Sequence, residues 1–245
     1  RGDGVHGPPA LPALDQGVRP MIDVAVTVLR VFCGEDESEG NPLGVVMDGP
    51  AVSADDRQAI ARFLGYSETV FVDDADAGRV QIFTPEVELP FAGHPVIGTG
   101  WLLRRDGRPA DALLTPAGKV PLEHRDERTT FARARAEWCP PFELVQHPSA
   151  AAVDALDSAG ASDGWSYEWA WIDEGAGTVR ARSFVAEAGI PEDEATGAAA
   201  VQLCAALGRE IEVRQGRGSV IHARPVGGNG APDDLVEFGG IVVID

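Results

Sequence analysis

The stretch from Leu89 to Leu103, LPFAGHPVIGTGWLL, is the starting point for predicting the fold. Its apolar run predicts a helix over roughly Pro95–Arg105. Gly98 and Gly100 are unexpected there, because a glycine inside a helix costs about 1 kcal/mol relative to alanine. Two interpretations stay open. The glycines allow close packing, or they leave the mouth of the helix open to an anionic ligand.

A second apolar helix is predicted over residues 194–208, EATGAAAVQLCAALG. The starts of the two helices can be aligned, with HPVIG at 94–98 matching DEATG at 193–197. In both segments a glycine follows the polar residue by four places, so Gly98 corresponds to Gly197. A helix that is apolar on all sides is buried inside its own lobe. The alignment therefore predicts two pseudo-equivalent lobes.

Alternating and β-branched segments predict strands around both helices. They lie at 21–32, 43–48, 68–72, 79–84, 112–126, 129–138, 167–173, 178–185, 211–216, 218–225 and 235–244. Further helices are predicted at 53–65, with Ser53 as N-cap and Gly65 at the end, and at 149–156. We expect an α+β protein with a Pro/Gly-rich N-terminal arm or leader at 1–20, an N-terminal lobe at 21–115 and a C-terminal lobe at 116–245. The last strand can return to the N-terminal lobe.

The composition of the chain argues against several kinds of binding partner and site. The net charge of −19, from 20 basic and 39 acidic residues, argues against nucleic acids and anionic membranes, which attract Lys and Arg. The longest apolar runs fall short of the roughly 18 residues that a membrane span needs. Three widely spaced cysteines (Cys33, Cys139 and Cys204) and five histidines fit neither a disulfide framework nor a metal site. A reducing cytoplasm is the simplest location.

Six segments together resemble the phenazine-biosynthesis PhzF-like family. In chain order they are EGNPLGVV, LGYSETVFV, IFTPEVELPFAGHPVIGTGWLL, LTPAGKVPL, VRARSFVAEAGIPEDEATGAAA and VEFGGIVVI, spread from about Val24 to Ile244. The resemblance implies a diaminopimelate-epimerase-like fold. In that fold, two similar lobes each form a β-barrel-like sheet around a central helix, and the active site lies between them.

The resemblance also implies an activity and the residues that carry it. The best-known member of the family isomerises a dihydro-hydroxyanthranilate by moving a proton, without a metal or an organic cofactor. By matching motifs, Glu68 is the expected acid and base, and His94 and Asp193 assist it. Backbone groups that hold the substrate carboxylate map to Gly93, Gly197 and Ala198, with Ser67 nearby. A homodimer is expected on the same ground.

Proton transfer from carbon makes these residue types reasonable. A base must sit close to the C–H bond, with a pKa nearer neutrality than the value of about 4.3 for a free glutamate. Burial in a cleft raises a carboxyl pKa in this way. We therefore expect a biosynthetic, cofactor-independent isomerase acting on a small carboxylate-bearing metabolite. The alternatives are a binding or scaffold protein with weakened or lost catalysis, and an enzyme of another class, such as cyclisation or dehydration.

Several positions depart from the family pattern. Glu194 stands where the family usually has proline, and Ala198 where it usually has serine. The family's Met-Gly-Arg-Pro-Ser segment is reduced to GRGS at 216–219, and the chain from Met21 onward is shorter than most relatives, mainly in the second lobe. These changes bear on the substrate and on activity itself. The related epimerases use two cysteines at the helix mouths, where this chain has none, so a two-thiol epimerase is disfavoured.

Overall fold

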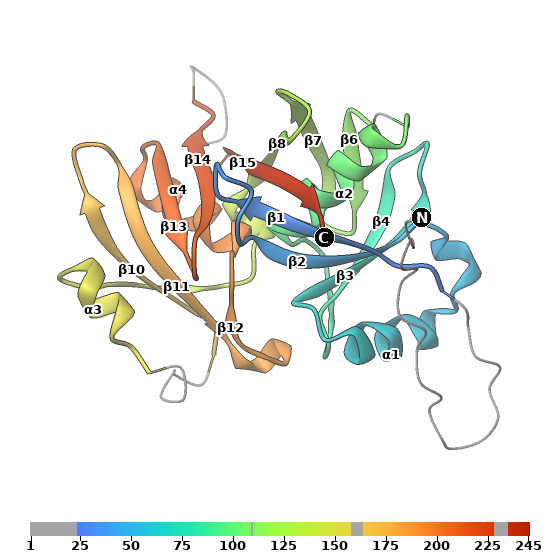
Figure 1. Ribbon diagram of the computed structural model, residues 1–245, viewed down its shortest axis with the longest axis horizontal. Helices are drawn as coiled ribbons and strands as arrows, with labels where there is room; N and C mark the ends of the chain where they lie inside the picture. Colours follow the sequence, from blue (N-terminus) through green and yellow to red (C-terminus); the bar gives the residue numbers. More distant parts are fainter. Residues whose placement is uncertain (1–23, 109, 158–163, 228–234) are drawn as a thin grey trace, which may run out of the picture.

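The first lobe is a closed barrel (Figure 1). The computed structural model describes residues 24–108, 110–157, 164–227 and 235–245. The barrel strands are β1 (Thr27–Cys33), β2 (Asn41–Val46), β3 (Glu68–Asp74), β4 (Arg79–Phe83), β6 (Ala112–Thr115), β7 (Gly118–His124), β8 (Thr129–Arg135) and β15 (Leu235–Ile244). The ring closes because β1 pairs with both β2 and β15. A short strand, β5 (Glu88–Leu89), lies beside β4.

Helix α2 (Gly93–Arg105) is the core of this barrel. It packs against β1, β2, β3, β6, β7, β8 and β15, and its residues from Gly93 to Leu103 are all buried. The predicted helix is confirmed, but it begins two residues earlier than expected. Ala92 is the extended N-cap, so Pro95 falls in the first turn, where its missing N–H costs no helical hydrogen bond.

Close packing explains both glycines inside α2. A Cβ atom at Gly98 would lie 2.6 Å from Leu43 Cδ2 and 2.8 Å from Val31 Cγ2. At Gly100 it would lie 2.5 Å from Leu122 Cδ1. The prediction that Gly98 sits in the first turn and grips an anion is therefore wrong, because the helix starts at Gly93 and the amide of Gly98 lies inside it.

The second lobe is built on α4 (Gly197–Leu207) and a sheet that runs β15–β14–β13–β11–β10–β9. Its strands are β9 (Glu143–Gln146), β10 (Ser166–Asp173), β11 (Thr178–Val185), β12 (Ile190–Asp193), β13 (Ile211–Gln215) and β14 (Ser219–Pro225), with β12 paired to β11. Among the described residues this order ends at β9, so the sheet stays open there (Figure 1).

Strand β15 joins the two lobes. One edge pairs with β8 along Leu235–Ile241. The other edge pairs with β14 over Val236–Gly239 and then with β1 over Ile241–Ile244. The last strand is thus part of the first barrel and also the first strand of the second sheet. The α+β, diaminopimelate-epimerase-like fold class is confirmed, whereas the predicted domain boundaries stay a prediction.

Other local predictions have mixed outcomes. Helix α1 (Ala54–Leu64) has Ser53 as its N-cap and ends at Gly65, as expected, and α3 (Ala150–Asp154) is a shorter helix. The predicted starts of β1 and α4 were wrong by three residues or more. Strand β1 begins at Thr27 because residues 24–26 pair with no strand, and α4 begins at Gly197 because β12 and its following turn occupy 190–196. Residues 21–23 and the 1–20 arm lie outside the described residues. None of the described helices has the length and apolar character needed to cross a membrane.

Candidate active site

Two parallel strands of the first barrel bring polar residues to one edge. β2 and β3 are paired in parallel, with Leu43 opposite Glu68, so their N-terminal ends lie at the same rim. Asn41 begins β2, and Ser67 and Glu68 stand at the start of β3. The N-terminus of α2 opens at this rim and contributes Gly93 and His94.

Glu68 and His94 form a buried acid–imidazole pair. Glu68 Oε2 lies 3.3 Å from His94 Nε2, and the two side chains are only 12% and 2% exposed. The two atoms are close enough for an ion pair, but their alignment is not that of a hydrogen bond, and neither has a hydrogen-bond partner among the described residues. Burial, and then the charge of Asp193, raise the pKa of Glu68 well above its ordinary value. Burial lowers the pKa of His94 to about 3. Both shifts favour an uncharged pair.

Asp193 reaches the same place from the second lobe. It ends β12, just before α4, and is buried. Its Oδ1 accepts a hydrogen bond from Asn41 Nδ2 at 2.8 Å, and its Oδ2 accepts one from Thr196 Oγ1 at 2.7 Å. Burial raises the pKa of Asp193, and these hydrogen bonds oppose the rise. The structure thus brings Glu68, His94 and Asp193 to one pocket, although they come from different lobes.

Asn41 is a member of the site that the sequence analysis did not single out. Its amide nitrogen donates to Asp193 Oδ1 and, at 2.9 Å, to the carbonyl of Ala195, and its Oδ1 accepts from Ser67 Oγ at 2.8 Å. The only available signal was its place in EGNPLGVV, one of the family-like segments. A buried asparagine cannot be distinguished by sequence from one in a turn.

The hydrogen bonds made by Asn41 and Pro42 indicate the tautomer of His94. An amide nitrogen carries two hydrogens, and Asp193 and Ala195 take both. The contact between Asn41 Nδ2 and His94 Nδ1 at 3.3 Å is therefore not a donated hydrogen bond. A backbone hydrogen bond with Pro42 opposes the lowering of the imidazole pKa, and Nε2 has no hydrogen-bond partner among the described residues, so we infer that Nδ1 carries the proton. Nε2 is left as an acceptor facing Glu68.

The starts of α2 and α4 meet at two glycines. A Cβ atom at Gly93 would lie 2.7 Å from the Cα of Gly197 and 2.8 Å from the nitrogen of Ala198. A Cβ atom at Gly197 would lie 3.1 Å from the Cα of Gly93. Each glycine is the first residue of its helix. The helices therefore correspond at Gly93 and Gly197, and the predicted match of Gly98 to Gly197 is wrong.

Both helix starts bring backbone amides to this meeting point. The first N–H groups of a helix have no partner inside it, and the helix dipole favours an anion beside them. Gly93, Gly197 and Ala198 all line the pocket. Apolar side chains form its walls: Leu89, Phe91, Pro140, Phe142, Trp165, Val185, Ala188 and Ile190. The described lining residues include no lysine or arginine, and the hydroxyls of Ser67 and Thr196 already donate to Asn41 and Asp193. Backbone amides and the indole N–H of Trp165 are therefore the donors left for an anion.

Other chemistry-bearing groups lie away from this pocket. The three cysteines are buried and do not line it, and burial raises the pKa of Cys33 to about 11 and of Cys204 to about 12. Within the described ranges, no group of three or more His, Cys, Asp or Glu side chains is placed to hold a metal ion.

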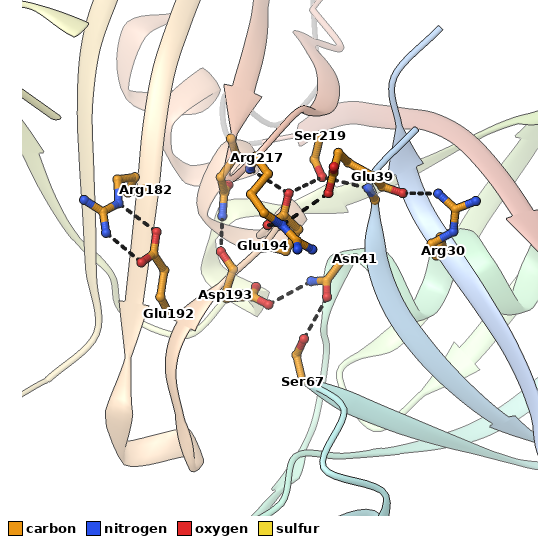
Figure 2. Close-up of polar contacts among 12 residues, drawn as sticks. Arg30, Glu39, Asn41, Ser67, Arg182, Glu192, Asp193, Glu194, Arg217 and Ser219 are labelled. Carbon is orange, nitrogen blue, oxygen red and sulfur yellow. Dashed lines mark hydrogen bonds and ion pairs between the residues drawn. The ribbon is translucent and has the colours of Figure 1, made fainter. Parts of the chain in front are cut away.

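The two departures nearest the site behave differently. Ala198 supplies an amide at the mouth of α4 but no hydroxyl. Glu194 does not line the pocket and instead holds the GRGS turn by hydrogen bonds. Its Oε1 accepts from the Arg217 amide at 2.8 Å and from Ser219 Oγ at 3.1 Å (Figure 2). The side chain in place of the family's proline thus stabilises the shortened segment.

Comparison with known proteins decides the family. The family model described as phenazine biosynthesis-like protein, PhzC-PhzF, matches residues 30–179, more than half of the chain. The chain belongs to this family. The trans-2,3-dihydro-3-hydroxyanthranilate isomerase of Pseudomonas chlororaphis is 31% identical, over 77% of this chain and 86% of that protein. Other curated relatives carry isomerase names but match over shorter stretches, and the chain spans less than half the length of the first of them.

Solved structures of PhzF-like and epimerase proteins share this fold. A predicted epimerase from Pseudomonas aeruginosa is 26% identical, with a TM-score of 0.68 over 91% of this chain and 97% of that one. A hydroxyproline epimerase from Agrobacterium vitis, with bound trans-4-hydroxy-L-proline, has a TM-score of 0.59 over 90% of each chain. At 12% identity the second likeness concerns the fold alone.

Proposed function

We propose that the chain is a cofactor-independent isomerase that moves a proton within a small carboxylate-bearing metabolite, with Glu68 as its acid and base. The observation that carries the proposal is the buried Glu68–His94 contact at 3.3 Å in a pocket between the lobes. Membership of the PhzC-PhzF family and the isomerase names of its relatives support the reaction class.

The proposed step begins with Glu68 in its carboxylate form. A carboxylate oxygen takes a proton from carbon, the C–H bond breaks, and its electron pair spreads into the adjoining unsaturated system of the substrate. The carboxylic acid of Glu68 then returns the proton to another carbon of that system. The step needs no oxidant or reductant. A positioned acid/base group of this kind contributes about 10²- to 10⁴-fold to the rate.

His94 and Asp193 assist in different ways. Because Nε2 of His94 is an acceptor, it stabilises Glu68 while Glu68 holds the proton between the two transfers. The charge of Asp193 raises the pKa of Glu68, which makes its carboxylate a stronger base.

The substrate carboxylate is proposed to bind at the paired helix mouths. The amides of Gly93, Gly197 and Ala198 would donate to it, and these charge-assisted hydrogen bonds are stronger than neutral ones. The hydroxyl of Ser67 donates to Asn41, so its oxygen stays free to accept a hydrogen from the substrate. The aromatic walls formed by Phe91, Phe142 and Trp165 suit a ring.

Turnover of trans-2,3-dihydro-3-hydroxyanthranilate, the compound in the relatives' name, tests this proposal. The expected result is isomerisation that does not change when chelators are added. A specific observation favours one alternative: Ala198 leaves the pocket without the family's hydroxyl. If the protein bound anthranilate in calorimetry but turned over neither this compound nor related dihydro-anthranilates, a binding function would replace the proposed activity.

We further propose that the protein is a homodimer, on its membership of the family. Light scattering at micromolar concentration should give twice the monomer mass of 25.8 kDa. A monomer mass would reject this assembly without affecting the proposed chemistry.

A further inference from the structure

We propose that Asn41 is a positioning residue that holds Asp193 of the second lobe in register with Ser67 and Glu68 of the first. The inference rests on the proposed function for its catalytic consequence. Asn41 is 1% exposed and does not itself line the pocket. It therefore acts on the site through its neighbours and not by touching the substrate.

Both hydrogens of the Asn41 amide nitrogen are donated to acceptors in the second lobe. Its two hydrogens bind Asp193 Oδ1 at 2.8 Å, at the end of β12, and the Ala195 carbonyl at 2.9 Å, between β12 and α4. Its oxygen turns back into the first lobe and accepts from Ser67 Oγ at 2.8 Å. Figure 2 shows this chain of contacts from Ser67 through Asn41 to Asp193. One side chain thus connects the residue before Glu68 to the carboxylate of Asp193.

Ser219 forms hydrogen bonds with the residues next to Asn41 and Asp193. The hydroxyl of Ser219 accepts from the Gly40 amide at 3.2 Å and donates to Glu194 Oε1 at 3.1 Å. Gly40 precedes Asn41 and Glu194 follows Asp193, so the same hydroxyl holds the chain beside each end of the Asn41–Asp193 hydrogen bond (Figure 2).

Glycine is required at position 40 for this arrangement. Its φ of 96° lies in the left-handed region, and a Cβ atom there would lie 2.6 Å from Cys33 Sγ. The backbone that enters Asn41 is therefore tightly constrained. Arg217 also bridges Glu39 and Glu194, but it is 73% exposed and adds little.

The Asn41 hydrogen bond has an electrostatic consequence that a purely structural contact would lack. Like charges face Asp193 from Glu68 on β3 and Glu194 beside it, and His94 and the hydroxyl of Tyr167 are its other titratable neighbours. None of these groups brings a positive charge while His94 is neutral. The hydrogen bonds donated by Thr196 and Asn41 favour the ionised form of Asp193.

The test measures the pKa of Asp193 by carboxyl ¹³C NMR titration in the full chain without substrate. The Asp193 signal is assigned by its loss in Asp193→Asn. In Asn41→Ala the pKa of Asp193 should rise by about one to two pH units, the size expected when a charge-assisted hydrogen bond is removed. The matched control is Gln58→Ala, which also removes an amide that donates to two carbonyls, those of Thr84 and Pro85, at residues that do not line the pocket. It should leave the pKa of Asp193 unchanged.

Kinetics gives the second readout. Because Asn41 does not line the pocket, Asn41→Ala should lower kcat by about 10- to 100-fold, with KM changed less than threefold. If Asn41→Ala fails to fold, Asn41→Leu repeats both measurements with a side chain of similar shape, because it removes the donors without adding a charge beside Asp193. An unchanged pKa of Asp193 in a folded Asn41 variant, or a kcat equal to that of Gln58→Ala, would overturn the inference. Since the titration needs no turnover, an inactive parent would reject the proposed function and leave this test standing.

Discussion

Glu68 Oε2 lies 3.3 Å from His94 Nε2, in a contact that buries an acid and an imidazole without a balancing cation. Burial disfavours the charged form of each group, so it raises the pKa of Glu68 and lowers that of His94. Such a pair costs stability at neutral pH, and catalysis would explain why it is kept.

Glutamine in place of Glu68 should make the protein more stable at neutral pH. The pKa of Glu68 is raised in the fold, so the folded state holds this proton more tightly than the unfolded chain does. The stability from that proton is fully present below the ordinary pKa of 4.5 and is lost as pH rises through the folded pKa. Glutamine removes this loss. Urea denaturation at pH 8 should show Glu68→Gln to be more stable than the parent by about 1 kcal/mol or more.

The matched control for this stability measurement is Glu35→Gln, a change at an exposed position. It should leave the free energy of unfolding within about 0.5 kcal/mol of the parent at both pH 5 and pH 8. If Glu68→Gln were less stable than the parent at pH 8, Glu68 would not carry the burial cost assigned to it.

Alanine at Gly93 should force the two helix mouths apart. The new Cβ atom would lie 2.7 Å from the backbone of Gly197, where no flexible side chain can give way. Overpacking of this kind costs about 1 to 3 kcal/mol. Thermal unfolding of Gly93→Ala against Gly227→Ala, whose Cβ meets nothing within 4 Å, isolates the effect. Equal melting temperatures would show that the helix mouths are not in close contact.

Variants at the mouth of α4 test the proposed carboxylate grip. Gly197→Val fills the space beside Gly93 and should abolish anthranilate binding in calorimetry, whereas Ala198→Ser restores the family's hydroxyl and should bind equally or more tightly. One added hydrogen bond is worth about 1 kcal/mol, or roughly fivefold in affinity. Given binding by the parent, unchanged affinity in a folded Gly197→Val protein would mean that the helix mouths serve packing only.

Removal of the Glu194 side chain should loosen the GRGS turn. Glu194→Ala loses the hydrogen bonds from the Arg217 amide and the Ser219 hydroxyl, at a cost of about 1 to 3 kcal/mol. Arg217→Ala keeps both of these bonds and loses only the exposed ion pairs to Glu39 and Glu194, so it should cost about 0.5 kcal/mol or less. Denaturant unfolding compares the two, and similar losses in both would assign the stability to the ion pair instead.

Sequence patterns were sufficient for the elements with strong periodicity. The helix at 93–105, the strand pair at 68–83 and the capped helix at 54–64 all stand close to their predicted bounds. Short elements without an apolar period were missed: β5, β9 and β12 have two to four residues each and are held by their neighbours. Such strands depend on tertiary pairing, which local propensity does not report.

The predicted site shows the same limit. The motif around Glu68, His94 and Asp193 pointed to residues that do meet. The glycine spacing misled, because α2 begins one residue before His94 whereas α4 begins four residues after Asp193. Sequence spacing cannot tell a glycine that packs against Leu43 from one that faces Gly197. Asn41 was not predicted as a site residue, because its hydrogen-bond partners Ser67 and Asp193 lie 26 and 152 residues away in the sequence.

Turnover of trans-2,3-dihydro-3-hydroxyanthranilate in D₂O, followed by NMR for the parent and Glu68→Gln, tests the central claim most directly. The account predicts that the parent forms the isomer, and that deuterium enters at the accepting carbon only in turnovers in which the Glu68 acid exchanges its proton with solvent before returning it. It also predicts that Glu68→Gln, folded and still able to bind anthranilate, is slower by about 10²-fold or more. Isomerisation by Glu68→Gln at the parental rate would contradict the assignment of Glu68 as the acid and base.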